Sequence, residues 1–259
     1  MRASASDAAV QSLVRGLSVI RAFDSEHVEL TLSEVARRAS ISPAAAGRFL
    51  RTLEHVGYVR SNGRRFALTP RVLELGFSYL SALSLPEMMQ PHLGQLSAEV
   101  DESVSAAVLS APDTVYVARV PTRRIMTVAI TIGTRFSAYA TSMGRVLLAE
   151  LPDEKVREIL AADPPRQLTP QTTTSVDALL EELALVRMQG WSLVDSELEL
   201  GLRSLAVPVH GKDGQVAAAF NVSTSATRAS LERMHDFYLP SALATGKSID
   251  AELRLLEQR

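Results

Sequence analysis

The chain has 259 residues, 46% of them hydrophobic and 22% charged, a composition that fits a globular protein of two domains and excludes fibrous and disordered classes. It contains no cysteine, which excludes disulfides, thiolate metal sites and a cysteine nucleophile. The N-terminal segment lacks a continuous apolar core, and no stretch approaches the roughly 20 apolar residues of a membrane span. We therefore expect a soluble, cytoplasmic protein with no membrane partner.

Charge is distributed unevenly along the chain. The net charge is −2, but residues 1–70 hold 10 arginines, no lysine and 6 acids, an excess of about four positive charges. The remaining residues carry 17 basic and 23 acidic side chains. A basic front on an acidic body suggests that only the front meets a polyanion.

The first 40 residues predict two helices. Apolar residues recur at intervals of three and four from Val10 onward, which predicts an amphipathic helix that ends near Phe23. A second, short helix begins with a capping box, in which Thr31 accepts a hydrogen bond from the Glu34 amide and the Glu34 carboxylate reaches back. Its apolar face predicts an end near Ala39.

A third helix and a hairpin complete the N-terminal part. Ser42 is a good N-cap, and Pro43 occupies the first helical position, where its missing N–H costs nothing. A buried stripe centred near Leu50 continues to Gly57, which can close the helix. Two short strands around an Asn-Gly turn follow. This order predicts a winged helix-turn-helix domain over residues 1–70.

The face of the third helix opposite its buried stripe is suited to DNA. Small residues at its start permit close approach, and its arginines can pair bidentately with guanine. Arginines at the hairpin tip and on the second helix can contact phosphates or the minor groove. Any solvated helix carries arginines, but the helix spacing, the Ser-Pro start and the basic hairpin together favour double-stranded DNA. The predicted DNA-binding residues are Arg37, Arg38, Ser42, Pro43, Ala44, Ala45, Arg48, Arg51, Thr52, His55, Arg64 and Arg65.

The rest of the chain predicts a linker helix over residues 71–85 and an α+β domain over residues 86–259. Strand-like and helix-like patterns are interleaved in this second domain. The expected helices are 88–100, 144–151, 153–162, 176–189 and 231–256, and the expected strands are 103–109, 114–120, 125–130, 205–210 and 215–223.

Several segments resemble a known family. The run TLSEVARRASISPAAAGRFLRTLEHVGYV, followed by FALTPRVLELG, resembles the N-terminal domain of the IclR family of bacterial regulators. Residues 139–149 (YATSMGRVLLA) and 195–208 (DSELELGLRSLAVP) resemble two effector-domain segments of that family. Within it the chain is most similar to the PcaR/PcaU/PobR group, which regulates breakdown of protocatechuate and 4-hydroxybenzoate through the β-ketoadipate pathway. The resemblance therefore implies a transcriptional regulator controlled by an aromatic acid or a related metabolite.

The resemblance also implies a GAF-like effector-binding domain, dimerisation through the N-terminal region and often a dimer of dimers on DNA. Family members that bind small oxo-acids have small polar residues at the positions of Asn221 and Ser223, so an asparagine is compatible with a larger ligand. Some members carry cysteine where this chain has Ser204.

A carboxylate ligand fits such a domain on chemical grounds. Backbone amides at the start of the helix containing Gly144 can bind an anion, and Arg119, Arg135 and Arg203 are candidate counter-charges as well as candidate structural arginines. The resemblance implies that Ser142, Met143, Gly144, Leu202, Ser204, Asn221 and Ser223 line the effector pocket. Arg119, Asp195 and Arg203 complete the predicted effector-binding residues.

Two other classes of function have less support in the sequence. A hydrolase or cofactor-dependent enzyme lacks its motif here, since the sequence has no G-x-S-x-G, P-loop or G-x-G-x-x-G, and we predict no catalytic residue and no cofactor. Asp195, Glu197 and Glu199 alternate as on a strand and can form a cation site, but pairing with Arg203 is favoured and no metal is predicted. A DNA-binding protein whose second domain serves only oligomerisation stays open, because only a ligand effect on DNA affinity would exclude it.

Overall fold

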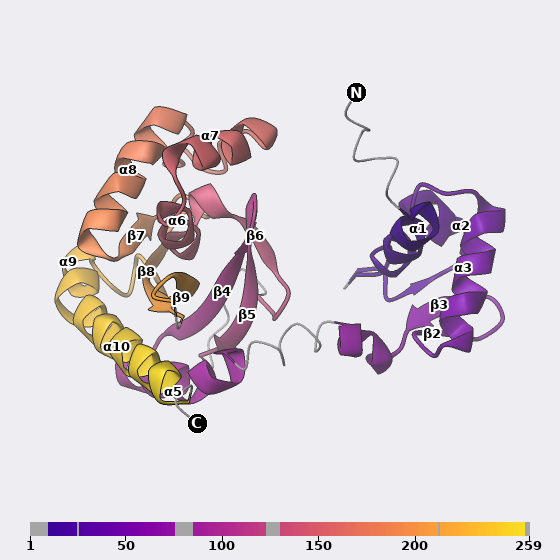
Figure 1. Ribbon diagram of the computed structural model, residues 1–259, viewed down its shortest axis with the longest axis horizontal. Coiled ribbons are helices and arrows are strands. Elements are labelled where there is room, and N and C mark those ends of the chain that lie inside the picture. Colours follow the sequence, from indigo (N-terminus) through magenta and orange to yellow (C-terminus); the bar gives the residue numbers. More distant parts are fainter. Residues whose placement is uncertain (1–9, 25, 76–84, 123–129, 212, 257–259) are drawn as a thin grey trace. The chain divides into compact units, whose positions relative to one another are not determined.

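The computed structural model describes residues 10–24, 26–75, 85–122, 130–211 and 213–256 (Figure 1). The chain forms two compact units, Met1–Ala82 and Leu83–Arg259. Most of the predicted linker helix and most of the strand expected at 125–130 lie outside the described residues. Of the described helices, none combines the length and the apolarity that crossing a membrane requires.

The N-terminal unit is a winged helix-turn-helix, as predicted. Its three strands form an antiparallel sheet in the order β1-β3-β2. Strand β1 was not predicted, because two residues are too few to show an alternating pattern. The elements are α1 (Gln11–Ile20), β1 (Glu29–Leu30), α2 (Leu32–Arg38), α3 (Pro43–His55), β2 (Val59–Ser61), β3 (Phe66–Leu68) and the 3₁₀ turn η1 (Pro70–Val72).

Local hydrogen bonds start α2 and α3 where the sequence predicts. Thr31 Oγ1 accepts from the Glu34 amide at 3.4 Å, while the Thr31 amide donates to Glu34 Oε2 at 2.8 Å, so the capping box of α2 is confirmed. The Thr31 amide and the Thr31 hydroxyl both donate to Glu34 Oε2, and these two bonds lower the pKa of Glu34. Ser42 caps α3 through the Ala45 amide, with Pro43 in the first turn. The helices and the hairpin share one core, formed by Val19, Ala22, Phe23, Leu30, Val35, Ala36, Ala39, Ala46, Leu50 and Val59.

The C-terminal unit has the predicted α+β organisation. Its six strands form one antiparallel sheet in the order β6-β5-β4-β9-β8-β7. The elements are α5 (Leu85–Val100), β4 (Ser103–Ser110), β5 (Asp113–Val120), β6 (Arg135–Ser137), η2 (Ala138–Ala140), α6 (Ser142–Ala149), α7 (Asp153–Ala162), α8 (Val176–Gln189), β7 (Ser192–Asp195), β8 (Leu202–His210), β9 (Val216–Ser225), α9 (Leu231–Arg233), the π-helical turn η3 (Met234–Tyr238) and α10 (Leu239–Leu256).

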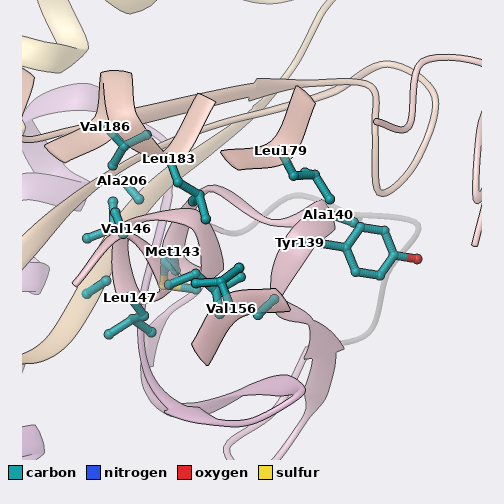
Figure 2. Packing of buried hydrophobic residues seen from close by; sticks show 14 of the residues in the cluster. Tyr139, Ala140, Met143, Val146, Leu147, Val156, Leu179, Leu183, Val186 and Ala206 are labelled. Atoms are coloured by element: carbon teal, nitrogen blue, oxygen red, sulfur yellow. The ribbon is translucent and has the colours of Figure 1, made fainter. Parts of the chain in front are cut away.

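Helices cover both faces of this sheet (Figure 1). On one face α10 packs closely, and Gly246 lies against Val207 and Phe220. On the other face α6 packs on β8 and β9 with α7 and α8 outside it. Figure 2 shows the side chain of Met143 of α6 with Val156 of α7 and Leu183 of α8 in this buried cluster. The second face also holds the cavity described below.

Among the differences from the sequence-based expectations, three concern β6, β7 and α6. Strands β6 and β7 were not predicted, because three and four residues give little periodicity. Helix α6 begins at Ser142 and not at Gly144, since Thr141 caps it. The carboxylates of Asp195, Glu197 and Glu199 do not share one strand, because β7 ends at Asp195 and Ser196 adopts a left-handed conformation with φ of 62°; Asp195 pairs with Arg203, the alternative that the sequence favoured.

Gly144 is required by a close approach of two backbone segments. A Cβ atom at this position would lie 2.1 Å from the Ala138 carbonyl oxygen. We expect Gly144→Ala to lower the free energy of unfolding by about 1–3 kcal/mol or more, because an overpacked backbone contact cannot relax through a side chain. Gly94→Ala on α5 is the matched control, since its Cβ would meet nothing within 4 Å and alanine favours a helix by up to about 1 kcal/mol. Urea denaturation of both variants checks this, and equal stabilities would contradict it.

Candidate DNA-binding face and effector cavity

The exposed face of α3 carries the side chains expected to meet DNA. Ala44, Arg48, Arg51 and His55 are all exposed, on the side opposite the fully buried Leu50. Thr52, Ser42 and Pro43 are exposed as well. Ala45 differs from the expectation, because its side chain is buried and faces the core. The helix therefore presents small residues and two arginines to solvent, while Ala45 is buried.

Arginines around this face are held in different ways. Arg38 donates through Nε to the Ala22 carbonyl at 2.6 Å and pairs with Asp24, so its guanidinium is committed within the protein. A hydrogen bond from His27, more than the charge of Arg38, lowers the pKa of Asp24. At the wing, Arg65 Nη1 donates to the Glu29 carbonyl at 3.2 Å. Arg37 and Arg64 are exposed.

A cavity of about 460 Å³ lies in the C-terminal unit, between the sheet and the start of α6. Strands β8 and β9, the Thr141–Ser142 cap and the loop after β7 contribute to its wall. This volume falls in the range of small-molecule sites. The described lining residues are Glu102, Tyr116, Thr122, Ile130, Ala140, Thr141, Ser142, Val194, Leu198, Glu199, Leu200, Gly201, Leu202, Ser204, Asn221, Ser223, Thr224, Ser225, Thr227 and Arg228.

One end of the cavity holds a buried cluster of hydroxyl and amide groups. Strand pairing places Ser204 opposite Ser223, and Asn221 lies two residues back on the same face. Asn221 Nδ2 donates to Ser204 Oγ at 2.7 Å and to Ser223 Oγ at 2.9 Å, and Ser142 Oγ lies 2.7 Å from Ser204 Oγ. Among the described residues, none donates to the buried Asn221 Oδ1. The cluster therefore offers a ligand one unsatisfied acceptor beside hydroxyl groups.

Another part of the wall carries an ion pair. Glu102 is buried, and its Oε1 accepts from Arg228 Nε at 2.8 Å, from Thr224 Oγ1 at 2.8 Å and from the Tyr238 hydroxyl at 3.4 Å. The hydrogen bond and charge of Glu102 raise the pKa of Arg228, so its guanidinium stays protonated. Arg228 is partly exposed and lies in the turn after β9.

Apolar side chains form another part of the wall. Val194, Leu198 and Leu202 contribute aliphatic surface, and Tyr116 contributes a buried ring. Burial raises the pKa of Tyr116 to about 12, so its phenol is neutral over the ordinary pH range. Such a wall can enclose an aromatic ring.

The predicted effector residues divide into two groups. Ser142, Leu202, Ser204, Asn221 and Ser223 line the cavity. The other five are not among the described lining residues. They are Met143, which packs in the apolar core; Gly144, which contacts Ala138; Arg203, which pairs with Asp195 at 3.0 Å and donates to the Ala229 carbonyl at 2.7 Å; Asp195 itself; and Arg119, whose Nη1 donates to Ser105 Oγ at 3.3 Å.

Sequence reasoning missed the charged residues of the cavity. Glu102 and Thr224 face each other across 122 positions of sequence, and Arg228 joins them from a turn. No periodic pattern or motif marks these positions, because only the antiparallel pairing of β4 with β9 brings them together. The single available signal was an acid directly before a strand.

A buried ion-pair network fixes the elements around the cavity. Arg145 of α6 is 3% exposed. Its Nη2 lies 2.6 Å from Glu197 Oε2, its Nη1 lies 2.6 Å from Glu182 Oε2 of α8, and its Nε donates to the Tyr139 carbonyl at 3.0 Å. Glu197 precedes the loop that lines the cavity, so this network joins that loop to two helices.

The described part of the chain contains no group of three potential metal ligands.

Comparison with known proteins decides the family. Residues 12–63 match the model of the IclR helix-turn-helix domain, and residues 77–251 match that of the bacterial transcriptional regulator IclR C-terminal domain. The chain belongs to the IclR family. It is thus a DNA-binding transcriptional regulator, and the predicted likeness to the PcaR/PcaU/PobR group is confirmed by its relatives.

Individual relatives of this IclR-family protein are similar over nearly their whole length. The Pca regulon regulatory protein of Pseudomonas putida is 41% identical over 93% of this chain and 84% of its own. The crystal structure of a transcriptional regulator from Rhodococcus sp. RHA1 is 52% identical, with a TM-score of 0.85 over 96% of this chain and all of that one. An IclR homolog from Microbacterium hydrocarbonoxydans, complexed with 4-hydroxybenzoate, is 24% identical with a TM-score of 0.84 over 94% of this chain and 99% of that one.

Arg145 should be essential for stability in a way that exposed arginines are not. We expect Arg145→Ala to lower the free energy of unfolding by about 3–5 kcal/mol, because Glu197 would be left buried without its counter-ion. The control is Arg157→Ala, which removes an exposed pair between α7 and Asp177 of α8 and should cost at most about 1 kcal/mol. Urea denaturation measures both, and similar losses would contradict the role given to Arg145.

Proposed function

We propose that this regulator binds its operator through α3 and the wing, and that an aromatic acid entering the cavity of the C-terminal unit alters that binding. The observation that carries the proposal is the cavity itself, in which apolar side chains are combined with buried hydroxyl and amide groups and with the partly exposed guanidinium of Arg228. This chemistry suits a ring with polar substituents. It favours an effector-binding unit over one that serves only oligomerisation.

Relatives support the class of effector. A relative at 41% identity is a Pca regulon regulatory protein, and a relative at 36% identity is a p-hydroxybenzoate hydroxylase transcriptional activator. A protein of the same fold was crystallised with 4-hydroxybenzoate. Relatives named for the acetate operon and for IclR itself are 28% and 30% identical. The aromatic acids and β-ketoadipate are therefore proposed ahead of small oxo-acids.

A homodimer, or a dimer of dimers, is part of this proposal. The N-cap residue Val10 and Leu13, Val14 and Leu17 of α1 are 64%, 62%, 51% and 48% exposed, at helical spacing. Such a stripe needs an apolar partner, and a second copy of α1 provides one. A two-fold axis between two α3 helices would also present two half-sites to DNA.

The proposed recognition arginines give a test of DNA reading. Arg48→Ala or Arg51→Ala should weaken operator binding by about 1–3 kcal/mol and relax base preference, because a bidentate pair with guanine is lost. Arg157→Ala is the control, since this exposed arginine lies on α7 of the other unit. Gel-shift titration on a selected operator and on random DNA measures the loss. An equal loss on both DNAs would make these arginines phosphate contacts and contradict base reading.

The proposed effector class is tested by ligand-dependent stability. Thermal unfolding should be followed with protocatechuate, 4-hydroxybenzoate, β-ketoadipate, pyruvate and glyoxylate. A native-state ligand at 100 times its Kd adds about 2.7 kcal/mol, and we expect this from the aromatic acids or β-ketoadipate. The same compound should change operator affinity in the gel shift. Stabilisation by pyruvate and glyoxylate alone would contradict the aromatic class, and stabilisation without any effect on DNA would contradict regulation.

A further inference from the structure

The two polar parts of the cavity differ in what they offer a ligand. The Ser-Asn cluster is neutral, and its unsatisfied atom is an acceptor, Asn221 Oδ1. Arg228 is the one cation among the described lining residues, accompanied by Glu102 and Glu199. A molecule with a hydroxyl group and a carboxylate therefore meets two unlike environments, and the difference selects one orientation.

The acceptor selects for a proton donor. Asn221 is only 4% exposed, so an oxygen left without a donor there is destabilising, because its lost hydration is not replaced by a hydrogen bond. A phenolic hydroxyl can donate to Oδ1 and accept from the hydroxyl of Ser204 or Ser223. A carboxylate at the same point would place two acceptors together. The cluster therefore discriminates against the charged end of an aromatic acid.

The cation selects for the carboxylate. Glu102 holds Arg228 through Nε, which leaves donors on the two Nη atoms. Nη2 lies 3.6 Å from Asp101, but that pair is exposed to water and is worth little. A guanidinium fork held by its Nε from behind is well placed to pair with an incoming carboxylate. Glu102 thus acts as a positioning residue.

The strand geometry separates the two ends. Asn221 and Ser225 are four residues apart on β9, a rise of about 13 Å. Arg228 lies in the turn that follows, where its amide donates to the Ser225 carbonyl at 2.9 Å. Arg228 and Asn221 are nevertheless residues of the same cavity wall, so a ring with substituents at opposite ends can contact both.

We infer that the cavity binds a hydroxylated aromatic acid in a single orientation, with its hydroxyl group on Asn221 and its carboxylate on Arg228. This inference rests on the aromatic effector of the proposed function and assigns the groups that orient it. It makes Arg228, and not Arg119 or Arg203, the counter-charge of the ligand.

Isothermal titration calorimetry with three ligands tests the orientation: 4-hydroxybenzoate, benzoate without the hydroxyl group, and the uncharged 4-hydroxybenzamide. The variant Glu102→Gln/Arg228→Gln removes the ion pair together and so leaves no buried carboxylate unpaired. This variant should bind 4-hydroxybenzoate and benzoate about 10- to 100-fold more weakly, because a charged hydrogen bond is lost. Its affinity for 4-hydroxybenzamide should change by less than about threefold. Glu102→Gln alone keeps the arginine and should keep the preference for carboxylates.

Asn221→Leu gives the complementary result. This variant should bind 4-hydroxybenzoate and 4-hydroxybenzamide about tenfold more weakly and should keep nearly the same affinity for benzoate. The matched control is Arg135→Gln on the edge strand β6. It removes a guanidinium that pairs with Asp113 at 3.0 Å and should change the affinity for none of the three ligands. A reversed pattern, or equal losses for all three ligands, would overturn the orientation alone. No binding heat from any of them with the wild-type protein would overturn the aromatic effector and the orientation with it.

Discussion

The bonds of the buried Arg145 guanidinium hold together the elements around the cavity of the C-terminal unit. It joins α6 to α8 through Glu182, to the loop after β7 through Glu197, and to η2 through the Tyr139 carbonyl. Removing these charges from water costs desolvation free energy, and the short, directed bonds of Arg145 offset that cost. These same segments carry Ser142 and the loop residues of the cavity wall, so the network sets the shape of the site without touching a ligand.

The close contact of Gly144 with Ala138 complements this network. This contact lets the first turn of α6 lie directly on η2. Ser142 Oγ then lies 2.7 Å from Ser204 Oγ on the sheet. The hydroxyl cluster therefore results from backbone packing and not from a flexible side chain that reaches across a gap. A rigid arrangement of this kind favours selective binding, since little conformational entropy is lost when a ligand enters.

The N-terminal unit depends on more local physics. Its helix starts are fixed by side-chain to backbone hydrogen bonds within three residues, at Thr31 and at Ser42. Its basic side chains serve two purposes, because Arg38 and Arg65 bond to carbonyl groups of the unit while Arg48 and Arg51 are exposed on α3. The exposed apolar side chains of α1 are the observation behind the proposed contact with a second copy of the chain.

What the sequence determined by itself was local. Capping at Thr31 and Ser42, the Asn-Gly hairpin and the apolar stripes predicted the winged helix-turn-helix, because each depends on residues a few positions apart. The exposed face of α3 followed from helical periodicity, and the serines and asparagine of the cavity came only from family resemblance. The tertiary structure alone decided that Ala45 is buried, that Met143 belongs to the core and that Arg203 is held by Asp195. It also brought Glu102 to Arg228, since contacts across more than 100 positions depend on strand pairing, which leaves no periodic trace in the chain.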